Sequence, residues 1–260
     1  MKRTVICHFF NEEWLLPWWC RHHKEIFDHG IIIDYHSTDR SCEIIKEICP
    51  TWQVVSSRNS NFEWHAVDTE VAGYEKTITG WRLALNATEF LIGNYQHLTN
   101  VTAPTNIYLD QFVFVDTLQD NEPRILDPNV PLHQQRKWGY GTDTKLPAEV
   151  TPRSVRSMHN HPYKYPAGGR HIWKERPTYN DLAIFYYGWA SLQEESMLRK
   201  LQIQTKLPLS DQKKKRGPGT HHNITREEIV DRYSRERLLC KNLTTQVVRL
   251  SAKHERTKKQ

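Results

Sequence analysis

Long apolar runs are missing from this 260-residue chain: none reaches the roughly 18 residues that a membrane-spanning helix needs. The basic start is followed by only a short apolar stretch, which Asn11-Glu12-Glu13 closes, so we expect a strand there rather than a signal peptide. The composition is nevertheless that of a folded chain, with 38% hydrophobic residues and nine tryptophans. A chain of this length predicts one domain with appendages.

Paired cysteine motifs and zinc motifs are also missing. The five cysteines include no C-x-x-C pair, and their odd number without a signal peptide favours reduced thiols in the cytoplasm. Fourteen histidines are present, but none of them forms an H-x-x-x-H zinc motif. The histidine content keeps a metal-dependent hydrolase as an alternative, but the missing zinc motif argues against it.

Positive charge is in excess, with a formal net charge of +6, and it is concentrated near the C-terminus. We expect a folded domain over residues 1–235 and a basic tail over residues 236–260. The tail could be a solvated terminus, or it could attract the chain to an anionic membrane surface. No aromatic residues alternate with these basic residues as they do in single-strand binders, so we expect no nucleic-acid partner.

Strands and helices alternate in the first half of the chain, and this predicts an α/β fold with a mainly parallel sheet. The middle, Thr117–Pro152, is rich in proline, glycine and aspartate and predicts a loop. A capping box, Thr225 with Glu228, predicts the start of a late helix. The expected strands are Thr4–Phe10, Ile31–Ile33, Gln53–Ser56, Glu89–Ile92 and Phe112–Asp116, and the expected helices are Pro17–Phe27, Cys42–Ile48, Asp68–Thr79, Ser191–Leu201 and Thr225–Leu239.

Polar residues follow the predicted strands, where open α/β sheets bind ligands. Asp34 ends one strand and could accept hydrogen bonds from a nucleotide base or ribose. It could equally form the turn that precedes the next helix, and Asp39 has the same two interpretations because aspartate is a good N-cap residue. His22 and His23 are adjacent on a predicted helix and do not share a face, so packing is favoured over metal binding.

The ordered motifs resemble nucleotide-sugar glycosyltransferases of the GT-A fold, in the bacterial and viral branch of family 2-like and family 92-like enzymes. The resemblance covers roughly residues 4–233. Its motifs are Asn11-Glu12, Trp18 or Trp19 with His22-His23, Asp34 to Asp39, Trp81 followed by Asn86–Phe90, Gly169-Arg170-His171, and Ser191 to Glu195 with Lys200.

The resemblance implies a Rossmann-like GT-A sheet and transfer of a sugar, with inversion, from a nucleotide-diphosphate sugar to a hydroxyl group of a glycan or similar acceptor. A UDP-sugar is the expected donor. A carboxylate would remove the acceptor proton, and Glu194 or Glu195 is expected in that role, with Asp143 next. Glu194 has a structural alternative, since Ser191 and Glu194 match a capping box. The implied donor-binding residues are Phe10, Asn11, Asp34, Asp39, Trp81, Arg153, Arg156, Arg170 and His171.

The sequence departs from the family at the metal-binding pair, so it does not decide whether a metal ion is bound. Such enzymes usually bind Mn²⁺ or Mg²⁺ through an Asp-x-Asp pair, but these positions are Asn86 and Thr88 here, and only Glu89 keeps a carboxylate. Glu89 and His171 could still hold a metal. Cationic residues could instead neutralise the diphosphate without one, or the chain could have lost catalysis and kept only carbohydrate or nucleotide binding. The cations considered are Arg153, Arg156, Arg170 and Lys174.

Overall fold

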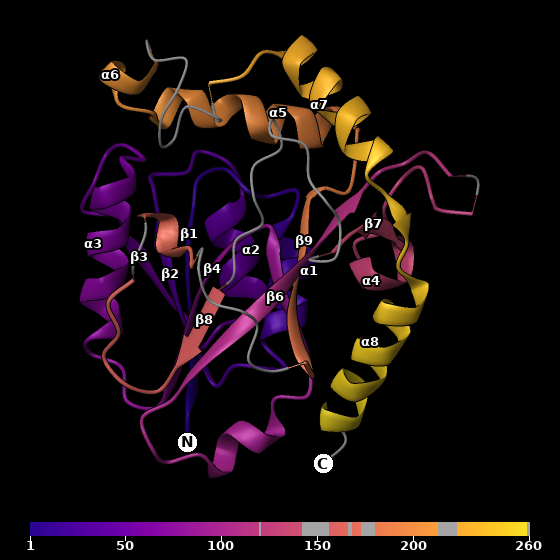
Figure 1. Cartoon of the computed structure of the whole chain (residues 1–260). Coiled ribbons are helices and arrows are strands. Elements are labelled where there is room, and N and C mark those ends of the chain that lie inside the picture. The colour runs from indigo at the N-terminus through magenta and orange to yellow at the C-terminus, as the bar shows by residue number, and fades with distance from the viewer. Residues whose placement is uncertain (120, 142–155, 166–167, 173–179, 213–222, 259–260) are drawn as a thin grey trace.

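The computed structural model describes residues 1–119, 121–141, 156–165, 168–172, 180–212 and 223–258. Over these residues the chain forms a mixed α/β domain, in which helices flank a central, largely parallel sheet (Figure 1). The predicted fold class is therefore confirmed.

Four parallel strands make the first half of the sheet, in the order β3-β2-β1-β4. In the register of β1 and β4, His8 lies opposite Asn86, and in that of β1 and β2, Phe9 lies opposite Asp34. The ends of these strands therefore meet at one edge of the sheet, which we call the carboxyl edge. The four strands are β1 (Arg3–Phe9), β2 (His29–Asp34), β3 (Gln53–Ser56) and β4 (Trp81–Asn86).

The second half of the sheet is mixed. β8 lies antiparallel between β4 and β6, β9 runs parallel to β6, and β5 and β7 pair antiparallel with β9 and β6. The expected strand near Ile92 is β5, which is not a neighbour of β1. The chain turns at Ala87 and Thr88, so one buried apolar run makes two strands. These elements are β5 (Glu89–Gly93), β6 (Asn106–Val115), β7 (Trp138–Tyr140), β8 (Arg156–His159) and β9 (Leu182–Trp189).

Helices cover both faces of the sheet. α3 (Trp64–Glu75) begins four residues earlier than expected, after Glu63 accepts hydrogen bonds from two backbone N–H groups of its first turn. Its Val67 and Val71 pack with Ile6 and Ile33 on one face. α1 (Leu16–His23) and α2 (Ser41–Ile48) pack on the other face, as their apolar periodicity predicts.

A second group of helices lies over the carboxyl edge (Figure 1). Gln202 near the end of α5 donates to the backbone oxygen of Asn11 at 2.6 Å, and Arg199 donates to Glu12 at 2.8 Å. The predicted capping box of Thr225 and Glu228 is confirmed. The one expected at Ser191 is not formed, because Gln193 caps α5 without a side-chain bond. The elements are α5 (Glu194–Gln202), η3 (Ile203–Lys206), α6 (Leu209–Gln212) and α7 (Arg226–Leu238).

The C-terminal segment is not the separate tail that its charge predicts. β10 (Lys241–Asn242) pairs with β7, and α8 (Thr244–Lys258) follows it. Leu243, Val247 and Leu250 join the main core, which excludes a boundary at residue 235 that leaves the tail solvated. The expected loop Thr117–Pro152 contains α4 (Leu132–Gln135) and β7. Short turns of 3₁₀ helix are η1 (Gln96–Asn100) and η2 (Gly168–Arg170), and no described helix is long and apolar enough to cross a membrane.

Candidate functional site

Three non-glycine residues at the carboxyl edge and beside it have left-handed backbone conformations. Their φ angles are 49° for Asn11 after β1, 60° for His36 after β2 and 59° for Arg170 in η2. Such conformations are uncommon outside glycine and cluster at functional sites. The Asn11 side chain is held from both sides, because it accepts from the Thr38 N–H at 2.7 Å and donates to Gln202 at 3.2 Å. The carboxyl edge therefore has the backbone conformations that are typical of a functional site.

Asp34 and Asp39 both organise the turn after β2. Asp34 Oδ1 accepts from the Ser37 N–H at 2.9 Å, and Asp39 accepts from the N–H groups of Ser41 and Glu13 at 3.0 Å each. The turn-forming interpretation is thus observed for both carboxylates. Asp34 remains half-buried at the end of β2, next to the end of β1, where a ligand at the carboxyl edge would meet it.

Two aromatic residues that were expected at the donor site, Phe10 and Trp81, are buried by the protein itself. Phe10 is 8% exposed, and the ammonium group of Lys206 lies 4.4 Å from its ring centroid, so that face is covered. Trp81 opens β4 at the end opposite the carboxyl edge, is fully buried, and donates to the Leu98 carbonyl at 2.8 Å. The assignment of Trp81 to donor binding is therefore wrong, because its side chain belongs to the core.

Glu89 and Arg156, which were expected to act separately, form a buried ion pair. Nε of Arg156 lies 2.9 Å and 3.1 Å from the two carboxylate oxygens, and Nη2 lies 2.9 Å from Oε1. Glu89 also accepts from the Asn86 N–H at 2.8 Å and from Gln111 at 3.3 Å. The proposed metal ligand and the proposed phosphate-binding cation therefore neutralise each other in the interior.

The described residues do not fit a divalent cation at this place. Asn86 and Thr88 are neutral, and the Glu89 carboxylate already has donors on both oxygens. His171, the second expected ligand, is half-buried with its ring against Gly169. Across the described parts of the chain, no group of three or more His, Cys, Asp or Glu side chains is arranged to hold a metal ion.

Arg170 reaches the joined ends of β1 and β4. Its Nη1 donates to Asp68 on α3 at 2.6 Å, and its Nη2 lies 3.4 Å from both His8 Nδ1 and Asn86 Oδ1. His8 and Asn86 face each other across the two strands, so one guanidinium group spans both strand ends. We call Arg170, Asp68, His8 and Asn86 the Arg170 site. It lies where the resemblance places the first aspartate of Asp-x-Asp.

Two glycines bring Arg170 to this position. A Cβ atom on Gly168 would lie 2.5 Å from the Trp64 ring, and Gly169 has φ +71°, a conformation that favours glycine. The Gly169 N–H also donates to Asp68 at 2.7 Å, so α3 holds both the turn and the guanidinium. The sequence showed the Gly-Gly-Arg-His motif, but it gave no signal that Asp68 and His8 would be its partners.

The three expected catalytic carboxylates differ in their surroundings. Glu194 opens α5 and forms an exposed ion pair with Arg226 of α7, whose Nη1 lies 2.7 Å from Oε2. This hydrogen bond lowers the pKa of Glu194. Glu195 follows it and is exposed. Asp143 lies outside the described residues, as do the expected cations Arg153 and Lys174.

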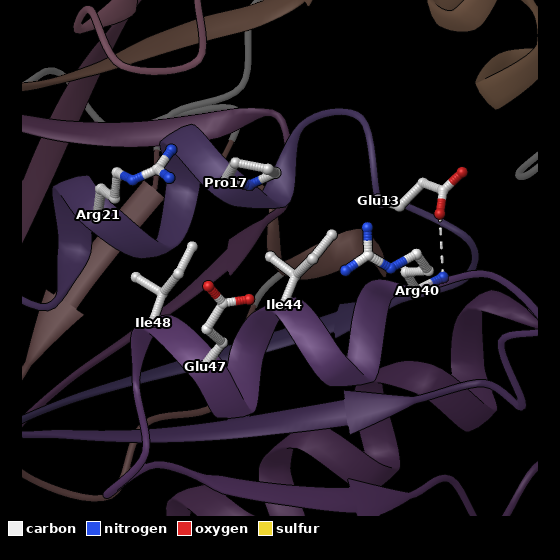
Figure 2. Close-up of a pocket in the computed structure, with 7 residues that line it drawn as sticks. All are labelled: Glu13, Pro17, Arg21, Arg40, Ile44, Glu47 and Ile48. Carbon is white, nitrogen blue, oxygen red and sulfur yellow. Dashed lines mark hydrogen bonds between the residues drawn. The ribbon is translucent and has the colours of Figure 1, made fainter.

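A groove of about 400 Å³ lies between α1 and α2 (Figure 2). Near its end the Arg40 N–H donates to Glu13 at 3.0 Å. The groove contains no member of the Arg170 site and is on the helix layer across the sheet from α3. It is therefore not the candidate site. Its lining residues are Glu13, Pro17, Arg21, Arg40, Ile44, Glu47 and Ile48.

No protein-family model matches this chain, and no curated protein matches it either. Among solved structures, residues 1–349 of S. aureus TarS in complex with UDP-GlcNAc match with 14% identity and a TM-score of 0.31, over 51% of this chain and 41% of that one. The same TarS fragment alone matches with 11% identity and a TM-score of 0.34, over 82% and 69%. HddC from Yersinia pseudotuberculosis matches with 10% identity and a TM-score of 0.32, over 75% and 81%.

In the match to the TarS complex, this chain therefore spans about two fifths of the length of its neighbour. TM-scores of this size do not establish a common fold, so these similarities carry no argument about activity.

Proposed function

We propose that this protein transfers a sugar from a nucleotide-diphosphate sugar, with a UDP-sugar as the expected donor, to a hydroxyl group of a glycan-like acceptor. The observation that carries the proposal is the Arg170 site, in which a cation stands at the joined ends of two parallel strands. The carboxyl ends of such strands are where open α/β sheets bind nucleotides. The ordered motifs around this edge match the donor-binding order of the GT-A enzymes that the sequence resembles.

The nucleoside end of the donor is assigned to Asp34 and Asn11. Both are half-buried, and both lie where β1 and β2 end. The Asp34 carboxylate would accept a hydrogen bond from the uracil N–H or from the ribose hydroxyl groups. Its bond to the Ser37 N–H fixes the carboxylate in place, so the turn-forming role and the binding role are compatible.

The diphosphate is assigned to Arg170. Its bond to Asp68 is short, but the two Nη2 contacts to His8 and Asn86 are 3.4 Å long, at the limit of hydrogen bonding. A phosphate oxygen could replace these weak contacts while Asp68 keeps the guanidinium oriented. Arginine is suited to this because its planar group meets phosphate oxygens with two N–H donors and stays charged. Arg153, His171 and Lys174 remain proposed contributors.

Proton removal from the acceptor is assigned to Glu195, ahead of Glu194. Inversion requires a carboxylate that takes the proton as the hydroxyl group attacks the anomeric carbon. Arg226 stabilises the charged form of Glu194 and thereby lowers its proton affinity. Glu195 is exposed in the first turn of α5, the helix that lies over the carboxyl edge. Asp143 remains a proposal as the third candidate.

A second function has its own supporting observation. If the diphosphate cannot displace the contacts of Arg170, the chain would bind nucleotide or carbohydrate without transferring sugar. The Glu89–Arg156 pair supports this alternative, because it removes the only carboxylate of the Asp-x-Asp region from chemistry. The alternative predicts nucleotide binding without release of UDP from any donor.

Contact with an anionic membrane remains part of the proposal, but only through the exposed basic residues of α8. α8 is packed on the domain through its apolar side, but Arg249 and Arg256 are exposed on it. Sedimentation with anionic and neutral vesicles would test this contact, and equal sedimentation with both kinds would exclude it.

A panel of nucleotide-diphosphate sugars tests the proposed function. A ligand that binds only the folded state stabilises it, by about 2.7 kcal/mol at one hundred times its Kd, so thermal unfolding identifies the donor. Release of UDP with and without acceptor, measured in EDTA and in Mn²⁺, then separates transfer from binding. Stabilisation with UDP release supports transfer, stabilisation without release supports the binding alternative, and no stabilisation by any nucleotide contradicts both.

A further inference from the structure

A second group of cations surrounds Trp189 at the end of β9. The Lys200 ammonium lies 3.6 Å from the Trp189 ring centroid, and the Arg232 guanidinium carbon lies 4.6 Å from it. Arg199 precedes Lys200 on α5, and Tyr186 lies on the same strand as Trp189. Two cations on one indole ring, with a third beside them, repel one another unless counter-charges are close.

The nearby carboxylates do not balance this charge. Arg199 pairs with Glu12 at 2.8 Å, and Arg232 contacts Glu236 at a longer 3.4 Å. Glu236 also accepts from the Tyr140 hydroxyl group, so its charge is shared. Within the described part of the chain, no ion pair joins Lys200 to a carboxylate.

The environment of Lys200 opposes its charge. Burial first, and then the charges of Arg199 and Arg232, lower the pKa of Lys200 well below its usual value, while Glu12 and Glu236 act more weakly in the opposite direction. A cation in this position gains from a negatively charged ligand, because the ligand supplies the missing counter-charge.

The group is only partly buried and lies on the same edge as the donor site. Lys200 and Tyr186 are only half-buried, and the Arg232 side chain is 25% exposed. Gly188 leaves space for Tyr186, since a Cβ atom there would lie 2.3 Å from the Tyr186 hydroxyl oxygen. α5 runs from this group to Asn11, where Gln202 is bound, so one helix connects the two places.

We propose that Lys200, Arg232 and Tyr186 form a second anion subsite that binds a phosphate or carboxylate group of a substrate. Lys200 and Arg232 would supply positive charge to the oxyanion, and the Tyr186 hydroxyl group would donate a hydrogen bond. The ligand class follows from the two cations that lie together on the Trp189 ring. Its assignment to a substrate rests on the proposed transferase function. The phosphate or carboxylate group that binds there could belong to the donor diphosphate or to an acidic acceptor.

Titration of inorganic phosphate into the full chain by calorimetry tests the subsite without any transferase assay. Lys200→Met keeps the apolar stem and removes the charge, and it should weaken phosphate binding at least 10-fold. Lys200→Arg should retain most of the binding, which a purely structural lysine would not predict. Lys46→Met removes an exposed lysine on α2 and should change nothing. Unfolding curves verify that each variant is folded.

Phosphate that fails to bind the wild-type chain, or that binds Lys200→Met as well as wild type, would overturn the proposal. Titration in saturating UDP distinguishes the two sources. Loss of phosphate binding assigns the subsite to the donor diphosphate, and unchanged binding assigns it to an acidic acceptor. If UDP does not bind but phosphate still requires Lys200, the proposed function fails and the subsite stands.

Discussion

Nη2 of Arg170 lies 3.4 Å from Oδ1 of Asn86, at the end of β4. The resembled enzymes carry the first aspartate of their metal-binding pair at this position. An asparagine here accepts a hydrogen bond from arginine without adding a second negative charge beside the Arg170–Asp68 ion pair. The neutral Asn86 is therefore consistent with a site that uses a cationic side chain for the diphosphate.

The first prediction concerns Asn86→Asp. A carboxylate at this position should pair with Arg170 and reduce the positive charge available to UDP, so UDP affinity should fall about 10-fold, the equivalent of 1.4 kcal/mol. No dependence on Mn²⁺ should appear. Calorimetry with UDP in EDTA and in Mn²⁺ measures both effects. Tighter, Mn²⁺-dependent binding by this variant would show that the position is still a metal site.

The second prediction concerns the Glu89–Arg156 pair. Glu89→Gln leaves a buried guanidinium without its counter-charge, and breaking such a pair costs about 3–5 kcal/mol of unfolding free energy. Urea unfolding measures this cost. Glu43→Gln is the matched control, because Glu43 pairs with Arg40 on the surface, and such pairs contribute about 0–1 kcal/mol. Equal, small effects of the two substitutions would contradict the structural role of Glu89.

The third prediction concerns Asp34. Asp34→Ala should weaken UDP binding by about 1–3 kcal/mol, the size of a lost hydrogen bond to a charged group. Asp34→Asn separates the two roles, since its amide oxygen can still accept from the Ser37 N–H while the charge is lost. If UDP affinity is unchanged in both variants, Asp34 forms the turn but does not bind the donor.

The fourth prediction compares Glu195 with Glu194. Glu195→Gln should lower kcat for transfer by about 10²–10⁴-fold, the range of general acid–base catalysis, with little change in UDP affinity. Glu194→Gln should have a much smaller effect, because Arg226 already holds that carboxylate in its charged form. Steady-state kinetics of both variants shows which of the two carboxylates removes the acceptor proton. A silent Glu195→Gln would assign proton removal to Glu194 or to Asp143.

The sequence predicted most of the fold because the first half of the chain has clear periodicity. The helices α1 and α2 and the capping box of α7 appear where apolar spacing and capping residues place them. The division of Trp81–Gly93 into β4 and β5 could not be read from the sequence. Every residue of this run except Asn86 is buried, so no alternation marks the turn.

The candidate site was predictable only in part. The end of a predicted strand identified Asp34, because a polar residue that follows an apolar run is visible in a sequence, whereas Asn86 was identified only through the family resemblance. The partners of Glu89 and Arg170 were not visible, because ion pairs depend on residues that are 67 and 102 positions away in the chain. From the sequence alone, the basic residues near Arg156 indicate phosphate binding. In the structure, however, the Arg156 side chain pairs with the buried carboxylate of Glu89.

The fifth prediction concerns acid stability and His159. Burial and the charge of Arg82 lower the pKa of this histidine to about 3, so it is neutral in the folded state. The unfolded chain binds a proton below about pH 6.5, so His159 should make stability fall as pH decreases from about 6.5 toward 3, by up to about 1.4 kcal/mol per pH unit. Glu75, which faces it at 3.8 Å, acts in the opposite direction because burial raises its pKa.

Urea unfolding at several pH values between 7 and about 5, the upper part of this window, measures the effect. His159→Gln should reduce the loss of stability on acidification, whereas His29→Gln, on the surface, should leave it unchanged. Parallel pH profiles of wild type and His159→Gln would show that His159 is protonated in the folded state.

Binding of the diphosphate by Arg170 is tested by a calorimetric titration of UDP into the wild-type chain and into Arg170→Lys, each in EDTA and in Mn²⁺. Lysine keeps the charge but loses the planar pair of donors. Wild type should bind UDP with the same Kd in both solutions, and Arg170→Lys should bind at least 10-fold more weakly while remaining folded. Binding that requires Mn²⁺ and is unaffected by Arg170→Lys would contradict the assignment of the diphosphate to Arg170.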